Sequence, residues 1–531
     1  MRFLSRASFE MTGFVPPSMT ELVPFFLNLY MLQLLTSSQT READAYTIKN
    51  KPISSINLME SASRAFVKAF IEEIPDKATH ISVYCGTGNN GGDGLATARL
   101  LKEQAYDSIS VKIMRFSPKE SADFKINLDR LKLSGIPLIE LSDANHLPKE
   151  NASVIIDALI GSGLNKALEG DLKTLINQLN KLKKKVISVD VPSGFPAEGI
   201  IDTSATVMKA KLTITFQRPK INFFFPESAE ATERFAVTDI GLDEDYIQSL
   251  PGPWKLIEEK DLKGLVKTRK AFSHKGSYGH ALIIAGNTRT MGAALLCADA
   301  CLHSGAGLTT ACIPEKGMPA LNAYAPEVMT ISRAELESEV NSGKFNSIAI
   351  GPGLGTNSNA TELVKLALNF NIPLLIDADA LNILAANPEL MSRLPKQTIL
   401  CPHMKEFDRL FGISATWWDR INLALRKAKE LNLLIILKNR YTFIALPEGD
   451  ILINPTGNPA MAVGGMGDVL SGMIAAFLAQ GYSAKQAAML GCFIHGKAGD
   501  ILHQEMGMFS IPPGELTMIL PEVIQSLTVP N

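Results

Sequence analysis

Short apolar runs alternate with amphipathic helical segments, and this alternation restricts the fold of the chain more than any other feature. Runs rich in β-branched residues predict buried strands at 80–85, 108–116, 153–156 and 186–189. Helical patterns lie between them, at 95–104, 124–134 and 172–185. Strands that alternate with helices form right-handed βαβ units, and therefore a mostly parallel sheet with helices on both faces. The first part of the chain is predicted to be an α/β domain.

A second series of the same kind follows. Its predicted strands are 281–285, 309–313, 347–350, 373–376, 398–400, 433–437 and 442–445. An amphipathic helix is predicted at 468–480, and Gly481 ends it. Residues 241–270 contain PGPWK and a charged stretch, a composition typical of a linker. Because 531 residues are too many for one core, we expect two unrelated α/β domains, at 31–247 and 248–531.

Composition narrows the class of protein. A hydrophobic content of 46% and a charged content of 20% are typical of globular proteins. The formal net charge of -2 argues against a nucleic-acid partner, which requires a concentrated basic surface. Six cysteines without a CxxC pair favour buried free thiols in a reducing cytoplasm over a zinc site.

The beginning of the chain is apolar at residues 22–35 (LVPFFLNLYMLQLL). This stretch is shorter than a membrane span and is broken by Pro24 and Asn28. No small-residue cleavage site follows it, as a signal peptide would require. We expect residues 1–30 to be an N-terminal extension that does not enter a membrane, with the first domain starting near Met31 in a capped helix.

A glycine-rich loop at residues 86–94 (GTGNNGGDG) separates a predicted strand from a predicted helix. Its first six residues fit the GxGxxG pattern of dinucleotide-binding folds. Those folds also place an acidic residue about 20 positions later, after the next strand, where this chain has SPK at 117–119. The loop instead brings polar oxygens from Asn89, Asn90 and Asp93 next to amides that can bind a pyrophosphate.

Two aspartates follow neighbouring strands, Asp157 in DALIGSG and Asp190 in DVPSG. The carboxyl ends of parallel strands meet at one edge of a sheet, so these side chains are expected to converge. Asn90, Asp157 and Ser193 then offer oxygen ligands to a cation, and Asp190 is a candidate base. A single such aspartate is more typical of a helix N-cap, whereas the combination indicates a site.

These motifs resemble the NAD(P)HX epimerase domain of YjeF-type proteins. The resemblance implies a Rossmann-like three-layer α/β/α fold over 31–247, and a potassium ion bound by Asn90, Asp157 and Ser193. It assigns catalysis to Asp190. It assigns substrate contacts to Asn89, Asn90, Gly91, Gly92, Asp93, Gly161, Ser162, Gly163, Leu164, Asn165, Lys166, Ala167 and Asp190. Two departures from the family are LMESAS at 58–63 and an unusually aromatic segment after Lys211, LTITFQRPKINFFFPES.

The second glycine-rich loop, GGMGD at 464–468, directly precedes the helix predicted at 468–480. Unpaired N–H groups at a helix N-terminus form an anion hole for a transferring phosphate. Asp468 can cap the helix, and it can also take the proton from a hydroxyl that attacks ATP or ADP. Further polar segments follow predicted strands and predict a shared crevice: Gly286-Asn287, GPGLG at 351–355, DAD at 377–379, PH at 402–403 and Lys438.

This second set resembles the ribokinase-like superfamily and, more narrowly, the ADP/ATP-dependent NAD(P)HX dehydratases. The resemblance covers about residues 255–531 and implies a ribokinase-like α/β domain that uses Mg²⁺ and ADP or ATP. It places Ala293, Gly353, Gly355, His403 and the catalytic Asp468 in the hydrate site. It places Lys438, Asn439, Arg440, Tyr441, Thr442 and Gly467 at the nucleotide. The chain departs from the family in reading Lys438-Asn439 for KG and Cys401-Pro402-His403 for TPH.

Both resemblances together imply a bifunctional metabolite-repair enzyme. It would interconvert the R and S epimers of NADHX and NADPHX and dehydrate the S epimer to NAD(P)H, using ADP or ATP. We expect a cytoplasmic homo-oligomer with small-molecule substrates and neither nucleic-acid nor membrane partners. A ribokinase-like small-molecule kinase fused to a nucleotide-binding module, and a non-catalytic scaffold, remain alternatives because a fold alone does not determine function.

Overall fold

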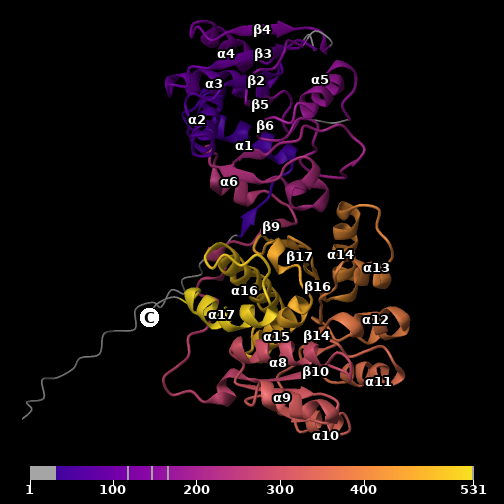
Figure 1. Cartoon of the computed structure of the whole chain (residues 1–531). Helices are drawn as coiled ribbons and strands as arrows, with labels where there is room; N and C mark the ends of the chain where they lie inside the picture. Colours follow the sequence, from indigo (N-terminus) through magenta and orange to yellow (C-terminus); the bar gives the residue numbers. More distant parts are fainter. Residues whose placement is uncertain (1–30, 117–118, 145–146, 164–166, 529–531) are drawn as a thin grey trace, which may run out of the picture.

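The computed structural model describes residues 31–116, 119–144, 147–163 and 167–528, which form two α/β lobes stacked end to end (Figure 1). The expected N-terminal extension at 1–30 and three expected site residues, Leu164, Asn165 and Lys166, lie outside the described residues. Each lobe is built on a mostly parallel sheet with helices on both faces, which confirms the α/β prediction.

The first lobe contains a seven-stranded parallel sheet in the order β4-β3-β2-β5-β6-β7-β8. Its strands are β2 Ile81–Cys85, β3 Ile109–Met114, β4 Leu138–Leu141, β5 Val154–Ala158, β6 Lys185–Val189, β7 Leu212–Phe216 and β8 Phe235–Thr238. Its helices are α1 Ser37–Asn50, α2 Ser55–Glu73, α3 Asn89–Glu103, α4 Ala122–Lys132, α5 Gly170–Lys181 and α6 Glu244–Ser249.

Two apolar layers cover this sheet. Ile156 of β5 packs in the core that includes α2, α3 and α4, and its neighbour Ile155 packs in the core on the α5 side. Every residue of β2 and β5 is buried, because successive side chains of a parallel strand enter opposite layers. The predicted capped helix is α1, where Thr36 and Gln39 form a capping box.

The second lobe contains an eleven-stranded mixed sheet in the order β1-β9-β18-β17-β16-β15-β14-β13-β10-β11-β12. Its strands after β1 are β9 Trp254–Leu256, β10 His280–Ile284, β11 Leu308–Cys312, β12 Met329–Ile331, β13 Ser347–Ile350, β14 Leu374–Ile376, β15 Ile399–Leu400, β16 Leu434–Leu437, β17 Thr442–Ala445 and β18 Ile451–Asn454. Its helices are α7 Glu259–Leu262, α8 Met291–His303, α9 Met318–Tyr324, α10 Leu336–Asn341, α11 Ser358–Ala367, α12 Ala378–Ala386, α13 Met404–Phe411, α14 Trp417–Leu431, α15 Met466–Ala479, α16 Ala484–Gln504 and α17 Pro513–Ser526. Helices α8, α15, α16 and α17 pack on one face, and α11, α12 and α14 on the other.

The junction between the lobes is more structured than the sequence predicts. Strand β1 (Leu32–Gln33) precedes the first lobe in sequence but pairs antiparallel with β9 in the sheet of the second lobe. The stretch at 241–270 that was expected to be a linker contains α6, β9 and α7, and Trp254 is only 5% exposed. The boundary expected after residue 247 lies within α6.

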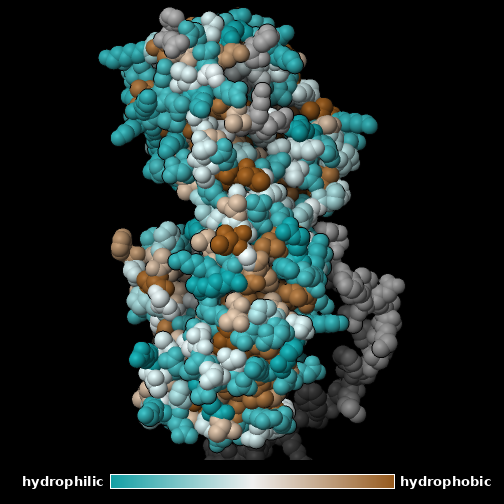
Figure 2. Space-filling view, turned by 90° about the vertical axis from the view of Figure 1, so that its right-hand side faces the viewer, coloured by the Kyte–Doolittle hydropathy of each residue, from teal (hydrophilic) through white to brown (hydrophobic). Residues whose placement is uncertain are grey.

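Figure 2 shows the two lobes meeting over a narrowed waist, with hydrophobic residues on both sides of it.

All six cysteines are buried free thiols, as predicted. Within the part of the chain that the structure describes, no helix is both long enough and apolar enough to cross a bilayer.

Candidate functional sites

The first glycine-rich loop connects β2 to α3 through very close backbone packing. A Cβ atom on Gly86 would lie 2.1 Å from the carbonyl oxygen of Leu159, and one on Gly91 would lie 1.9 Å from the carbonyl oxygen of Gly86. Both positions therefore exclude any other residue. Since α3 begins at Asn89, this packing presents the N-terminus of the helix at the carboxyl edge of the sheet.

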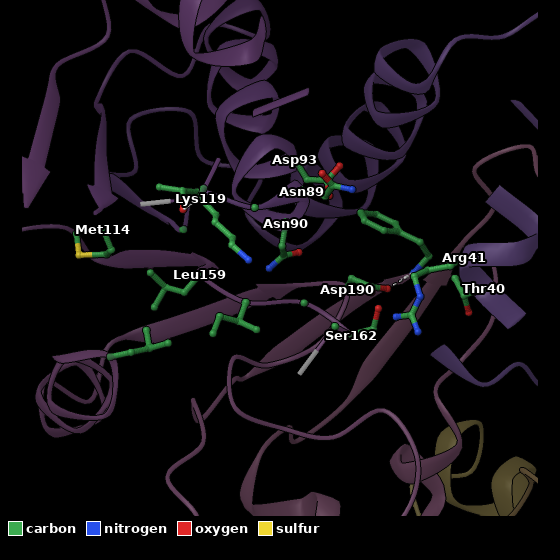
Figure 3. A pocket seen from close by; sticks show the side chains of 18 of the residues that line it. Thr40, Arg41, Asn89, Asn90, Asp93, Met114, Lys119, Leu159, Ser162 and Asp190 are labelled. Atoms are coloured by element: carbon green, nitrogen blue, oxygen red, sulfur yellow. Dashed lines mark hydrogen bonds between the residues drawn. The ribbon is translucent and has the colours of Figure 1, made fainter. Parts of the chain in front are cut away.

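A cavity of about 1050 Å³ opens at that edge (Figure 3). In the close-up, Asn89, Asn90 and Asp93 approach it from α3, and Ser162 and Asp190 approach it from the strand ends. The structure thus brings together the predicted residues Asn89, Asn90, Asp93, Gly161, Ser162, Gly163 and Asp190. Three predicted substrate residues are not among those that line the described cavity: Gly91, Gly92 and Ala167.

Asp157 lies beneath this cavity as a fully buried carboxylate. Ser193 donates to it from both its hydroxyl, at 2.6 Å, and its backbone N–H, at 2.9 Å, and the Ser188 hydroxyl donates at 2.9 Å. Burial raises the pKa of Asp157, although these hydrogen bonds oppose the rise. Among the described residues, no lysine or arginine forms an ion pair with this carboxylate.

Asn90 packs against the loop that follows β5, and the Ile160 N–H of the same loop donates to the Ser193 hydroxyl at 2.9 Å. The Asn90 side chain contacts Gly161, where a Cβ atom would lie 3.2 Å from the Asn90 Oδ1. The Asn90 Nδ2 is buried and has no hydrogen-bond partner within the described residues. A buried carboxylate without a cationic partner and an unsatisfied amide, which can present its oxygen after a flip, are features that suit a bound cation. Of the three predicted cation ligands, Asp157 and Ser193 are in direct contact.

Asp190 follows β6 in a left-handed backbone conformation, with φ of 63°. Its Oδ1 lies 2.7 Å from the Lys220 Nζ and accepts hydrogen bonds at 3.2 Å from the Thr215 hydroxyl and from the Phe216 N–H. A non-glycine residue holds this conformation only where its surroundings compensate the strain, which is common at functional sites. The carboxylate is therefore held in one orientation at the cavity wall.

Helix α1 brings further polar residues that the sequence did not reveal as site residues: Thr40, Arg41 and Asp44. Burial raises the pKa of Asp44 to about 6, and the negative charge of Asp190 adds to the rise. Burial, with Asp190 and Asp44 nearby, also raises the pKa of Asp93 well above its usual value. No local pattern marks Asp44, because the fold alone brings α1 to the cavity.

The second glycine-rich loop leads into α15. Gly465 is the N-cap residue and has φ of 98°, which a residue with a side chain rarely adopts. Asp468 lies in the first turn of the helix, next to the free N–H groups. Burial raises the pKa of Asp468 to about 7; the carboxylates of Asp377 and Asp379 add to this, and Lys438 opposes it.

An ion pair between Lys438 and Asp377 lies close to Asp468 and acts on its pKa. The Lys438 Nζ lies 2.7 Å from the Asp377 Oδ1, and the Ser471 hydroxyl of α15 donates to the Asp377 Oδ2 at 2.7 Å. Burial alone would lower the pKa of Lys438, but the charge of Asp377 raises it above its usual value. The lysine therefore carries a positive charge next to Gly467, where a Cβ atom would lie 3.5 Å from the Lys438 Nζ.

The predicted hydrate residues lie at neighbouring strand ends. Asn287 and the Thr290 hydroxyl donate to the Gly353 carbonyl at 3.0 and 2.7 Å, and a Cβ atom on Gly353 would meet that of Ala293 at 2.9 Å. The Gly355 N–H donates to Asp379 at 2.8 Å. These bonds fix the GPGLG loop against α8.

His403 is the N-cap residue of α13, where its Nδ1 accepts from the N–H groups of Lys405 and Glu406 at 3.1 and 3.3 Å. Its backbone pairs with that of Lys438, so β15 and β16 bring the histidine and the lysine next to each other. The Nε2 of the half-exposed ring lies 3.4 Å from the Oε1 of the buried Glu406.

A second cavity of about 470 Å³ lies beside these residues. The predicted nucleotide residues Lys438, Asn439, Arg440, Thr442 and Gly467 line it, whereas the ring of Tyr441 packs against Phe224 of the first lobe. The sequence did not single out two further walls, the segment of Thr456 and Gly457 and the α16 residue His495. Burial lowers the pKa of His495 to about 4, so its imidazole is neutral.

In comparisons with known proteins, each of the two lobes matches a different family model. Residues 55–222 match the family model described as YjeF-related protein N-terminus, and residues 281–522 match the model described as NAD(P)H-hydrate dehydratase. The bifunctional NAD(P)H-hydrate repair enzyme of Moorella thermoacetica is 33% identical over 93% of this chain and 97% of its own length. The Escherichia coli enzyme of the same description is 33% identical over 88% of this chain and 89% of its own.

Among solved structures, the ADP/ATP-dependent NAD(P)H-hydrate dehydratase of Bacillus subtilis, co-crystallised with ATP and Mg²⁺, is similar to this chain. It shares 32% sequence identity with a TM-score of 0.46, covering 51% of this chain and 97% of that one. Family models over both lobes and relatives of nearly equal length lead to one conclusion. The chain belongs to the family of bifunctional NAD(P)H-hydrate repair enzymes.

Proposed function

We propose that the two cavities carry out two consecutive steps of one repair. The first lobe interconverts the R and S epimers of NADHX and NADPHX, and the second dehydrates the S epimer to NAD(P)H while consuming ADP or ATP. The observation that carries this proposal is the position of Asp468. A carboxylate with a pKa of about 7 lies in the first turn of α15, beside the Asp377 and Lys438 ion pair.

In the second lobe, Asp468 is the general base. A group with a pKa close to the working pH transfers protons efficiently, and here it would accept the proton of the ring hydroxyl. That oxygen attacks the terminal phosphorus of the nucleotide. The phosphate is later released with loss of a ring proton, which restores the dihydronicotinamide ring of NAD(P)H. The α15 amides and Lys438 stabilise the negative charge that develops on the phosphoryl group.

Magnesium is part of this proposal. Mg²⁺ usually binds through one or two carboxylates and the phosphates of its substrate. The described residues contain no group of three or more histidine, cysteine, aspartate or glutamate side chains placed to hold a metal, which fits an ion carried by the nucleotide. Asp379, near Asp468 and next to the GPGLG loop, is the carboxylate that would orient it. Bound there, Mg²⁺ would neutralise phosphate charge.

In the first lobe, Asp190 is the proposed base. Its ion pair with Lys220 keeps it oriented, and a potassium ion bound by Asn90, Asp157 and Ser193 would balance the buried charge of Asp157. The cation would fix the loop of Gly161 to Gly163 against α3, and substrate phosphates would bind at the helix N-terminus. Asn89 and Ser162 line the same cavity and would contact the substrate.

The decisive experiment adds the purified protein to mixed NADHX epimers with ADP or ATP and follows the absorbance of NADH. We expect nucleotide-dependent recovery of NADH with release of inorganic phosphate, and loss of that recovery in Asp468→Asn. Unchanged recovery in that variant would contradict the role of Asp468. Accumulation of a stable phosphoester without NADH would instead identify a small-molecule kinase.

A cytoplasmic location and a homo-oligomeric assembly are also part of the proposal. The buried free thiols suit a reducing compartment. Light scattering of the purified protein measures the assembly, and a mass equal to one chain, 57.5 kDa, would contradict it.

A further inference from the structure

The aromatic segment after Lys211 reaches the junction between the two lobes. It forms two 3-10 helices, η2 Ile221–Phe224 and η3 Pro226–Glu230. The side chains of Phe223, Phe224 and Phe225 are each 2% exposed. Phenylalanines that are this strongly buried at a junction fix the geometry of the elements they contact.

Two of these phenylalanines pack in opposite directions. Phe223 packs within the first lobe, with ring centroids 6.0 Å from Phe195 and 5.1 Å from Phe235. Phe225 packs into the second lobe, 5.5 Å from Phe443 and 6.1 Å from both Trp254 and Trp418. The segment is therefore anchored on both sides.

Phe224 lies between these anchors and contacts the rim of the second cavity. Its ring meets that of Tyr441 edge to face, with centroids 5.0 Å apart. Tyr441 lies in the turn between β16 and β17, and its sequence neighbours Arg440 and Thr442 both line the cavity. The Arg440 guanidinium also lies over the Tyr441 ring, 4.5 Å from its centroid. Phe224 therefore supports, from outside, the turn whose other face lines the cavity.

The same segment begins in the first cavity. Lys220, the residue before η2, lines that cavity and lies 2.7 Å from Asp190. One short run of backbone thus extends from the Asp190 carboxylate to the Tyr441 turn. This arrangement places a residue of the first lobe in contact with a turn that lines the cavity of the second.

We propose that Phe224 is a positioning residue for the nucleotide cavity of the second lobe. By holding the Tyr441 ring it keeps the β16–β17 turn in the conformation that presents Lys438, Asn439, Arg440 and Thr442 to the nucleotide. A turn that is ordered in advance loses less conformational entropy on binding, so nucleotide affinity depends on the first lobe. The inference rests on the proposed function only in taking this cavity as the ADP or ATP site.

The test measures the Kd of ADP and of ATP by calorimetry on the full chain. Phe224→Ala removes two aromatic contacts, one with Tyr441 and one with Phe235 of the first lobe at 5.8 Å. Loss of the contact with Tyr441 should raise both Kd values about two- to tenfold. The KM of the hydrate, and kcat at saturating nucleotide, should stay unchanged, because Phe224 touches neither reacting group. Phe224→Leu, which keeps apolar volume, should give an intermediate Kd.

The matched control is Phe223→Ala. It removes a ring of the same size and burial from the neighbouring position, but one that packs within the first lobe. It should lower the thermal midpoint as much as Phe224→Ala while leaving the nucleotide Kd unchanged. The emission of the three tryptophans, Trp254, Trp417 and Trp418, reports whether the junction remains folded in each variant. Trp254 and Trp418 stack at 5.3 Å, and the backbone N–H of Trp417 donates to Glu227 of η3 at 3.1 Å.

Tyr441→Ala completes a double-mutant cycle. If Phe224 acts through Tyr441, the nucleotide Kd of the double variant should not exceed the higher of the two Kd values of the single variants. A Kd in Phe224→Ala within twofold of the wild type, or an equal rise in Phe223→Ala, would overturn the inference. A wild-type chain that binds neither nucleotide would instead refute the proposed function, so the two failures are distinct.

Discussion

At the scale of single residues, the charges around Asp468 determine the pH at which the second lobe works. Asp468 must be deprotonated to accept a proton, and its pKa is about 7. Dehydration should therefore slow as the pH falls below 7, about tenfold for each further pH unit. Measuring kcat/KM for the hydrate between pH 5 and 9 at saturating nucleotide tests this expectation.

Asp377→Asn tests the physical cause of that pKa. The substitution removes a negative charge that raises the pKa of Asp468 and leaves the positive charge of Lys438 without its partner. Both changes stabilise the ionised form of Asp468, so the acid limb should move to lower pH. Asp129→Asn, an exposed position in α4, should leave the profile unchanged. If the midpoint of the acid limb stays at pH 7 in Asp377→Asn, a group other than Asp468 determines the pH dependence.

Asp44 illustrates the cost of a buried carboxylate in the first cavity. Its pKa is about 6 in the folded chain against 3.8 as an ordinary value. The folded state therefore binds the proton more tightly than the unfolded state, and stability is lost as the pH rises from about 4 through 6. Asp44→Asn removes this loss and should stabilise the protein by about 3 kcal/mol at pH 7, with little effect at pH 4.

Thermal or urea unfolding at both pH values measures this difference. The neighbouring Glu42→Gln is the control, because Glu42 is exposed on the same helix and should change stability little at either pH. Equal stability of Asp44→Asn and the wild type at pH 7 would mean that Asp44 is well solvated.

At the scale of elements, the start of α15 depends on one backbone conformation. Gly465 has φ of 98°, and a Cβ atom there would lie 2.7 Å from the Leu296 Cδ1. Gly465→Ala should therefore move the helix N-terminus and reduce dehydration about 10- to 100-fold, the order expected when oxyanion donors are lost. Gly464→Ala is the matched control, since a Cβ atom at Gly464 meets nothing within 4 Å. Initial rates of NADH recovery compare the two variants, and equal rates would contradict this role for Gly465.

Several strands inside a parallel sheet were predictable, because burial on both faces selects continuous apolar runs. This holds for β2, β5 and β6, and it is why the sequence alone predicts Asp157 and Asp190 at one edge of the sheet. β7, which lies between β6 and β8, was nevertheless missed. Strands at edges or junctions were missed as well. The half-exposed β4 and the three-residue β9 carry no such run and form only because a neighbouring strand pairs with them.

Residues of the candidate sites were predicted or missed for a similar reason. Side chains that come directly after buried strands were named from the sequence, whereas Asp44 and His495 were not, because each lies on a helix that the fold brings to a cavity. The aromatic segment after Lys211 was visible only as a departure from the family. Its partners Tyr441 and Trp418 lie some 200 residues later in the chain, and no local pattern links them.

At the scale of the whole molecule, the two lobes are joined by strand pairing, a hydrogen bond and a common apolar core. The backbone of β1 pairs with β9 of the second lobe, and the Arg218 Nε of the first lobe donates to the Gln33 carbonyl at 3.0 Å. A single apolar core contains Phe225 from the first lobe together with Trp254 and Phe443. The junction is thus continuous, whereas the two cavities are lined by separate sets of residues.

Separate cavities imply that each site can be disabled without the other, and Asp190→Asn tests this. Asparagine tolerates left-handed backbone, so the substitution removes charge with little strain. Epimerisation should fall about 10²- to 10⁴-fold. With mixed epimers and ATP, NADH absorbance should then rise quickly for the S epimer and afterwards only at the spontaneous rate of epimerisation. A single fast phase in Asp190→Asn would contradict its role.

Mixing the Asp190→Asn and Asp468→Asn chains extends this test to the route of the substrate. Each chain keeps one intact cavity, and the first cavity is lined only by residues of the first lobe. If the S epimer leaves the first cavity and diffuses to the second, the mixture should recover all of the hydrate in one fast phase. Fast recovery that requires both aspartates in one chain would instead mean that the epimer passes directly between the lobes, a route for which the separate cavity linings give no support.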